Sequence, residues 1–199
     1  MRIDRHDPKQ RTKPAVQVKE YKIAKLNIRY PKDRLHEVSS GTMAGWIKEV
    51  VDIESPVHKD EVIRRIVNAA GIKRVGRRIR STFEIGLSAA SKAKDVTQRG
   101  DFIWMIGMQE PKIRSRHNLP NQSRSISLIA PEEISSAILE VTKSTYGIQR
   151  DMIPGEVSNL FGFKRVTQDM NDLINKLVGD LISDNKLIDK GVYLTLPED

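Results

Sequence analysis

The chain has 199 residues, of which 38% are hydrophobic and 30% are charged, and its net charge is +8. It contains no cysteine and no run of the roughly 20 apolar residues that a membrane-spanning helix needs, so we expect no disulfide framework, no thiolate zinc site and no membrane partner. Because no apolar signal region follows the basic N-terminus, we expect a cytoplasmic protein.

The predicted elements begin after residues 1–20, a charged segment without helical or strand periodicity that is predicted to be a flexible basic arm. Residues 21–30 alternate loosely between apolar and polar side chains and predict a short strand. Apolar residues at three- and four-residue spacing predict a helix over residues 42–53. A second helix is predicted from His58 to Gly71, where a glycine suits a left-handed C-cap because it lacks a Cβ.

A third helix is predicted over residues 76–92, and residues 96–105 are predicted to form a β-hairpin. Residues 110–128 are basic, contain prolines and lack an apolar period, so they are predicted to be a linker. The same order of elements then follows. It comprises helices over 131–146 and 155–161, a turn at Gly162, a helix capped by Thr167, and a hairpin over 187–196.

An internal repeat underlies this order, because residues 71–103 match residues 162–194 without a gap, 91 positions later. The apolar phase of the third helix is kept in both copies. The paired core residues are Ile79, Phe83, Leu87 and Ala90 in the first copy and Met170, Ile174, Val178 and Leu181 in the second. We therefore predict a unit of helices and hairpin that has been used twice.

Three helices followed by a β-hairpin, with a tight glycine turn before the third helix, form the pattern of a winged helix-turn-helix. The predicted fold class is α+β, mainly α, with two tandem winged helix-turn-helix domains whose wings are small β-hairpins. Their predicted boundaries are residues 21–109 and 129–199.

Charge is divided unevenly along the chain. Residues 1–37 hold 11 Lys and Arg against 5 Asp and Glu, residues 38–125 hold 16 against 9, and residues 126–199 hold 7 against 12. This asymmetry predicts that the first two thirds of the chain contact a polyanion and that the last third need not.

The basic residues gather where a winged helix contacts duplex DNA, at the third helix and the wing. The predicted DNA-binding residues are Lys73, Arg74, Arg77, Arg78, Arg80 and Ser81 at the third helix, Arg99 at the wing tip, and Arg114 and Arg116 in the linker. Arginine suits this role because its planar guanidinium binds phosphate or guanine with two hydrogen bonds. The alternative is a solvated basic surface that contacts nothing.

The second copy differs on the corresponding outer face. It carries Gln168, Asp169, Asp172 and Asn175, which are predicted to bind a protein partner, because carboxylates repel a phosphate backbone. Lys164 and Arg165 are retained in the turn, where they could equally cap the preceding helix. We expect this copy to pack against the first or to contact a partner protein.

Catalytic patterns are sparse. The four histidines lie in separate segments without metal-ligand spacing, and neither a phosphate-binding P-loop nor a G-x-S-x-G turn occurs. We therefore predict no catalytic residues, no metal, no cofactor and no enzymatic activity in this chain.

Several short motifs together resemble an uncharacterised domain family at the C-terminal end of large bacterial and archaeal superfamily I helicase proteins, which often carry a restriction-endonuclease-like domain. The motifs are residues 54–66, Gly71 with residues 77–79, and residues 100–104, 113–116, 131–134 and 160–165. The resemblance covers residues 21–196. It implies an accessory position beside a helicase or nuclease, in cis or in trans, and transfers no catalytic residue.

Two functions are consistent with these patterns. The first is a non-catalytic DNA-binding accessory module, in which the first winged helix binds duplex DNA and the second contacts it or a helicase or nuclease partner. The alternative is a protein-interaction or dimerisation module of a helicase complex without direct DNA contact, which leaves a homodimer open.

Overall fold

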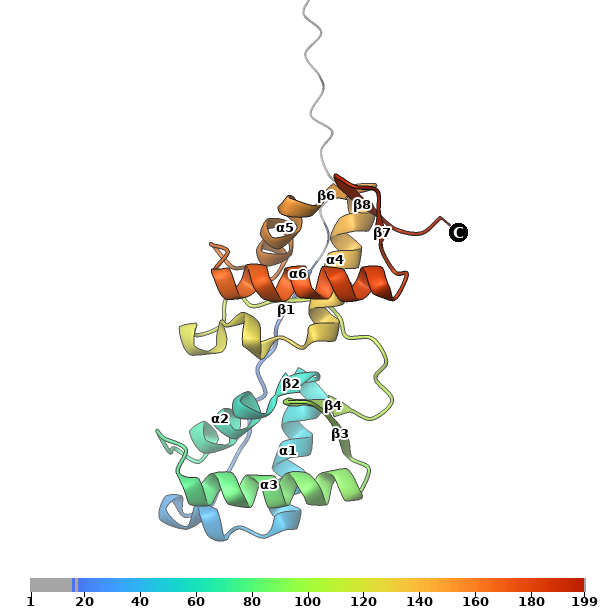
Figure 1. The fold of residues 1–199 in the computed structure, drawn as a ribbon. Coiled ribbons are helices and arrows are strands. Elements are labelled where there is room, and N and C mark those ends of the chain that lie inside the picture. Colours follow the sequence, from blue (N-terminus) through green and yellow to red (C-terminus); the bar gives the residue numbers. More distant parts are fainter. Residues whose placement is uncertain (1–15, 17, 199) are drawn as a thin grey trace, which may run out of the picture.

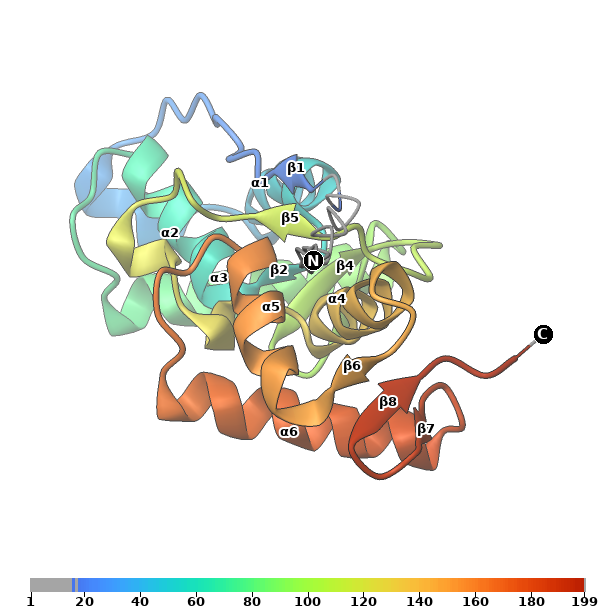
Figure 2. The same cartoon turned by 90° about the horizontal axis from the view of Figure 1, so that it is seen from above.

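The computed structural model describes residues 16 and 18–198 and shows an α+β protein that is mainly helical (Figure 1). Most of the predicted flexible arm, residues 1–15 and 17, lies outside the described residues. The end of that arm, Lys19–Glu20, is strand β1 and pairs in parallel with β5, Arg114–Ser115. Figure 2 shows the two strands side by side. The prediction of flexibility was therefore wrong for Lys19 and Glu20.

The first unit of the fold runs from α1 to β4. Its elements are α1 (Ser40–Glu54), β2 (Val57–His58), α2 (Lys59–Ala69), α3 (Arg77–Lys92), β3 (Val96–Arg99) and β4 (Phe102–Met105), preceded by the 3-10 helix η1 (Lys32–Glu37). The strands form an antiparallel sheet in the order β2-β4-β3. The strand predicted over residues 21–30 is absent. Instead, the backbone N–H of Ala24 donates to the Glu54 carboxylate, 2.8 Å away, so this segment bonds to a side chain there.

Local sequence signals explain how these helices begin and end. The Ser39 side chain accepts a hydrogen bond from the Thr42 N–H and caps α1, and His58 Nδ1 accepts one from the Asp60 N–H and caps α2. After α2, Gly71 has a φ of 70°, in the left-handed region that favours glycine. The two caps thus fix where α1 and α2 begin, and Gly71 allows the tight turn between α2 and α3.

The second unit runs from α4 to β8. Its elements are α4 (Pro131–Ser144), β6 (Ile148–Gln149), the 3-10 helix η4 (Arg150–Met152), α5 (Ile153–Leu160), α6 (Gln168–Ser183), β7 (Ile188–Asp189) and β8 (Tyr193–Thr195). The strand order is β6-β8-β7, which matches the first sheet position for position.

The 91-residue offset holds over more of the chain than the sequence repeat indicated. It places β2 on β6 and α3 on α6 with identical bounds. It also relates the residues with positive φ, because Gly71, Lys94 and Gly100 correspond to Gly162, Asn185 and Gly191. The backbone path is therefore repeated even where the side chains differ.

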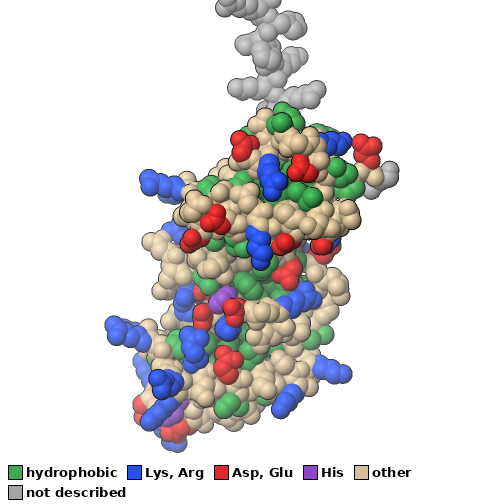
Figure 3. Space-filling model, in the orientation of Figure 1, with side chains coloured by type: hydrophobic (Ala, Val, Ile, Leu, Met, Phe, Trp, Pro, Cys, Tyr) green, Lys and Arg blue, Asp and Glu red, His purple; other side chains and the backbone are tan. Residues whose placement is uncertain are grey.

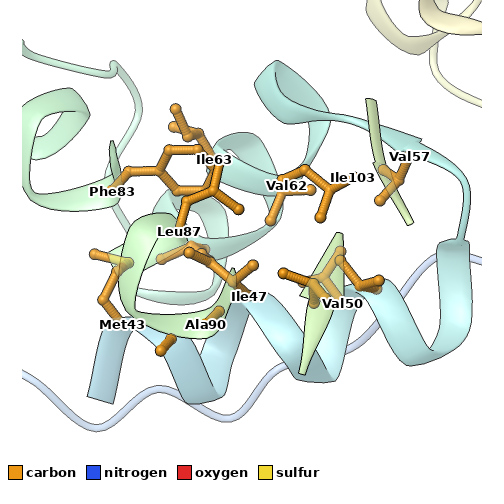
Figure 4. Packing of buried hydrophobic residues seen from close by; sticks show 14 of the residues in the cluster. Met43, Ile47, Val50, Val57, Val62, Ile63, Phe83, Leu87, Ala90 and Ile103 are labelled. Carbon is orange, nitrogen blue, oxygen red and sulfur yellow. The ribbon is translucent and has the colours of Figure 1, made fainter. Parts of the chain in front are cut away.

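Each unit has its own hydrophobic core. In the first core, Phe83 and Leu87 of α3 pack against α1 and α2, as Figure 4 shows, and Phe83 is only 1% exposed. The apolar faces predicted for the third helix of each copy are confirmed: seven of those eight side chains are buried and Ile79 is partly buried against its core. Burial of each large apolar side chain stabilises the fold by about 1.5–3 kcal/mol.

The segment predicted to be a linker, residues 110–128, lies between the two units (Figure 1). It contains β5 and the 3-10 helices η2 (Asn121–Ser123) and η3 (Ile126–Leu128). Leu119 and Ile126 are buried, and so is the side chain of Arg116. Part of this segment is therefore packed between the units, whereas other residues of it, such as Lys112 and Asn118, are exposed.

Candidate nucleic-acid interface

Four cationic side chains surround the turn before α3 and the start of that helix. Lys73, Arg74, Arg77 and Arg78 are all exposed. Within the described part of the chain, none of them forms an ion pair or a side-chain hydrogen bond. Figure 3 shows Lys and Arg side chains projecting from the lower left of the molecule, where α3 begins. We call these four residues the first basic turn.

Arg80 and Ser81 continue this surface along α3, but Arg80 differs from the first basic turn. Its guanidinium lies 2.8 Å from a carboxylate oxygen of Asp60 on α2, and both side chains are nearly half exposed. Such an exposed pair contributes little stability, yet it partly neutralises the charge that a phosphate would meet. Ser81 is exposed beside it on the outer face.

Arg99 occupies the end of β3 at the predicted wing tip, but its side chain turns back onto its own sheet. The guanidinium carbon lies 4.2 Å from the centre of the Trp104 ring, and an N–H donates to the Met108 carbonyl oxygen at 3.2 Å. This cation–π contact orients Arg99 away from the tip. The wing-tip phosphate contact predicted for Arg99 would require the side chain to leave Trp104.

Arg114 and Arg116 were predicted to bind DNA, but the side chain of Arg116 is buried and that of Arg114 is only 12% exposed. Arg114 lies 2.6 Å and Arg116 2.9 Å from Glu133 Oε2, and the Glu133 side chain is fully buried in the first turn of α4. Arg114 also donates to the carbonyl oxygens of Glu54 and Pro56, at the C-terminal end of α1 and just beyond it. Since both guanidinium groups are bonded inside the protein, we remove both arginines from the candidate DNA-binding residues.

A second buried ion pair lies on the first-unit side of the same region. Arg65 of α2 donates three hydrogen bonds, of 2.9, 3.0 and 3.3 Å, to the two carboxylate oxygens of Glu54, and it also lies 2.9 Å from Glu61. The Ser123 hydroxyl from η2 donates to Glu61 at 2.7 Å. We call Glu54, Glu61, Arg65, Arg114, Arg116 and Glu133 the junction cluster.

Tyr21 joins the two parts of the junction cluster. Its hydroxyl donates to Glu54 Oε2 at 2.8 Å, and the guanidinium carbons of Arg114 and Arg116 lie 4.7 and 5.0 Å from its ring centre. Burial raises the pKa of the Tyr21 phenol above its ordinary value, and the nearby Glu54 carboxylate raises it further. The phenol therefore stays protonated and keeps its hydrogen bond to Glu54.

The second unit has a smaller basic turn at the position equivalent to the first. Lys164 and Arg165 are exposed, and within the described residues no ion pair or side-chain hydrogen bond involves them. They do not cap the preceding helix, which was one of the two roles left open by the sequence. We call this pair the second basic turn.

The residues of α6 predicted to bind a partner are polar and partly bonded to one another. Gln168 donates to Asp172 at 2.7 Å, and Asn175 donates to the backbone oxygen of Asn171 at 2.9 Å. Gln168, Asp169 and Asp172 are exposed, whereas Asn175 is half-buried. Figure 3 shows acidic side chains over the start of α6. This face is acidic where the matching face of α3 is basic.

A different face of the second unit is apolar and uncovered, and sequence reasoning missed it. In the first unit, Glu61 and Phe102 are 4% and 8% exposed, because residues 110–130 cover them. The equivalent Met152 and Tyr193 are 45% and 49% exposed. Val192 extends this surface and is 65% exposed. This uncovered face can be found by comparing equivalent residues of the two copies, but only after the structure shows that residues 110–130 cover the first copy.

Comparison with known proteins gives one match. A family model described as a protein of unknown function (DUF3320) matches residues 33–81, from η1 to the start of α3, and so includes the first basic turn. No match was found among curated proteins or among solved structures. Within the described residues, no group of three or more His, Asp and Glu side chains is placed to bind a metal, and no helix is long and apolar enough to cross a membrane.

Proposed function

We propose that this chain is a non-catalytic DNA-binding module in which the first unit, a winged helix-turn-helix, binds duplex DNA through the first basic turn. The observation that carries the proposal is the grouping of Lys73, Arg74, Arg77 and Arg78 at the start of α3, all exposed and without ion pairs or side-chain hydrogen bonds to the described residues. In winged helices the third helix enters the major groove, and this turn then lies against the phosphate backbone.

The contrast with the buried arginines supports this choice of residues. Arg114 and Arg116 share the carboxylate of Glu133 and donate further hydrogen bonds to backbone oxygens, so their guanidinium groups are already engaged inside the protein. The first basic turn keeps its charge, and each phosphate that it neutralises releases a counterion from DNA. Four such contacts correspond to a slope of about −3.6 when log K is plotted against log salt concentration.

The resemblance to domains of superfamily I helicase proteins supports a position beside a motor or nuclease, in cis or in trans. In this arrangement the first unit holds duplex DNA while the second unit, a second winged helix, contacts the partner. The acidic outer face of α6 suits that division, because its exposed Asp169 and Asp172 repel the DNA backbone.

A salt titration with fluorescent DNA tests the proposal. We expect a duplex oligonucleotide to bind at low salt and to lose affinity steeply as salt rises, with single-stranded and forked DNA measured alongside. Because the aromatic content is only 5%, base stacking contributes little and single strands are expected to bind more weakly than duplexes. Absence of duplex binding at low salt, or binding independent of salt, would contradict the proposal.

A second candidate function, self-association, is favoured by the uncovered apolar face of the second unit. Exposed aromatic and apolar clusters are typical of protein interfaces. The rim of this face carries both signs of charge, with Arg150 and Asp189 3.5 Å apart. Charges of both signs at the rim avoid the repulsion that a rim of a single sign would cause between two copies.

Light scattering at increasing protein concentration tests this candidate. We expect a dimer that Val192→Glu with Tyr193→Glu abolishes, because two carboxylates would be buried without partners. Ile85→Glu is the control, since the exposure of Ile85, 58%, lies between those of Val192 and Tyr193 but the residue belongs to α3. A monomer at every concentration, or a dimer that both variants weaken equally, would exclude self-association through this face.

A further inference from the structure

We infer that the second basic turn contacts the same DNA duplex as the first basic turn, so that one protein binds the duplex backbone at two places. This inference rests on the proposed DNA binding by the first unit. It also revises the expectation that the second unit contacts only protein. The turn of that unit is assigned to DNA, and the acidic face of α6 is still assigned to a protein partner.

The two turns share one backbone structure. Gly71 and Gly162 have φ values of 70° and 81°. The Gly71 N–H donates to the Asn68 carbonyl at 2.9 Å, and the Gly162 N–H donates to the Asn159 carbonyl at 3.0 Å. The two hydrogen bonds are equivalent under the 91-residue offset. The second turn therefore presents its two cations on the same scaffold as Lys73 and Arg74.

The two turns also lie on the same side of the molecule. In Figure 1, α3 and α6 run in the same direction, and the turn before each lies at the left. Figure 2, turned by 90°, again places both turns at the left. Lys and Arg side chains project from that edge of both units in Figure 3. A straight duplex laid along this side meets both turns.

Contacts through residues 110–128 hold the second turn in place. The Arg116 N–H donates to the carbonyl oxygen of Phe161, the residue before Gly162, at 2.9 Å. The linker backbone passes so close that a Cβ on Gly162 would lie 2.9 Å from the backbone nitrogen of His117. Arg114, two residues before Arg116, is bonded to the end of α1. The distance between the two turns is thus fixed before DNA binds, so binding does not carry the entropic cost of ordering them.

The acidic start of α6 limits what the second turn can do. Asp169 and Asp172 follow it within two helical turns and are exposed. They oppose insertion of α6 into the major groove, because carboxylates would face the phosphates that border it. We therefore assign Lys164 and Arg165 a contact with the phosphate backbone, without base reading, which strengthens binding only when the duplex is long enough to reach both turns.

The test compares duplexes of about 10 and about 30 base pairs, roughly one and three helical turns. The variant is Lys164→Gln with Arg165→Gln, and its control is Lys186→Gln with Lys190→Gln, which removes the same charge from exposed sites beyond the other end of α6. Circular dichroism and thermal unfolding establish that both variants are folded.

On the long duplex we expect the turn variant to bind roughly tenfold more weakly than the control, with a salt slope lower by about 2. On the short duplex we expect the two variants to agree within about twofold, since it occupies the stronger first turn alone. Equal affinities of both variants for the long duplex, with binding still dependent on Lys73 and Arg74, would overturn this inference alone. No binding of the wild-type protein to either duplex would overturn the proposed function as well.

Discussion

Replacing Glu133 by alanine is expected to lower the free energy of unfolding by about 3–5 kcal/mol, because it leaves buried guanidinium groups without a counterion. The Glu133 side chain is fully buried, and its partners Arg114 and Arg116 are 12% and 2% exposed. Truncation also removes hydrogen bonds from both guanidinium groups and from the backbone N–H of Arg114. Urea unfolding followed by circular dichroism measures the loss.

The neighbouring Glu132 provides a matched control. It lies in the same first turn of α4 and shares the same favourable interaction with the helix dipole, but it is only half-buried. We expect Glu132→Ala to cost no more than about 1 kcal/mol. If Glu133→Ala and Glu132→Ala were equally stable, the interaction with the helix dipole would account for the whole effect, and the ion pairs of Glu133 would contribute no stability.

Protonation of Glu133 at low pH is also expected to lower the free energy of unfolding of the wild-type protein. Burial alone would raise the pKa of Glu133, but the charges and hydrogen bonds of Arg116 and Arg114 outweigh it and hold the pKa below its ordinary value of 4.5. A carboxylate with a lowered pKa stabilises the fold above its unfolded pKa, and this stabilisation is lost as the pH falls through the folded pKa. The Glu133→Ala variant is expected to lack this component of acid unfolding.

Neutralising the first basic turn is expected to weaken duplex binding on the order of 100-fold at low salt. Lys73, Arg74, Arg77 and Arg78 are replaced together by glutamine, which keeps the helix propensity similar. The salt slope is expected to fall by about 3.6, because four phosphate contacts are lost. Fluorescence anisotropy at several salt concentrations measures both quantities. Stability should change little, since all four side chains are exposed.

A control variant that loses the same charge elsewhere distinguishes DNA contact at the first basic turn from attraction of DNA by the net charge of the protein. Four exposed lysines of the second unit serve this purpose, namely Lys143, Lys176, Lys186 and Lys190. Their replacement by glutamine lowers the net charge equally but leaves both basic turns intact. Equal weakening of binding by the two variants would show that DNA is attracted by overall charge and would contradict a site at the first basic turn.

Secondary structure was predictable because it depends on signals that are local in the sequence. The core of α3, its start after Gly76, the start of α4 at Pro131 and the cap of α6 at Thr167 all follow from spacing and terminal residues, and the structure confirms each of them. The strand predicted over residues 21–30 failed, since loose alternation does not reveal that the backbone of Ala24 is bonded to a carboxylate 30 residues away.

The residues of the candidate site were harder to predict, because exposure of a charge is a property of the folded chain. Arg77 and Arg114 are indistinguishable as basic residues in the sequence. Only the position of Glu133, 19 residues beyond Arg114, determines that one arginine is exposed and the other bonded internally. Likewise, Arg99 was placed correctly at the end of a strand, yet nothing local showed that Trp104 would hold its guanidinium.

The carboxylates of the junction cluster are not reproduced by the repeat. Under the 91-residue offset, Glu54 corresponds to Thr145, Glu61 to Met152, and Glu133 to Thr42. Each of these carboxylates therefore stands on only one copy, and the boundary between the two units is asymmetric. If the second unit preceded the first, the repeat would bring Arg114 and Arg116 to Thr42 in place of Glu133, and a threonine supplies no charge to balance a buried guanidinium.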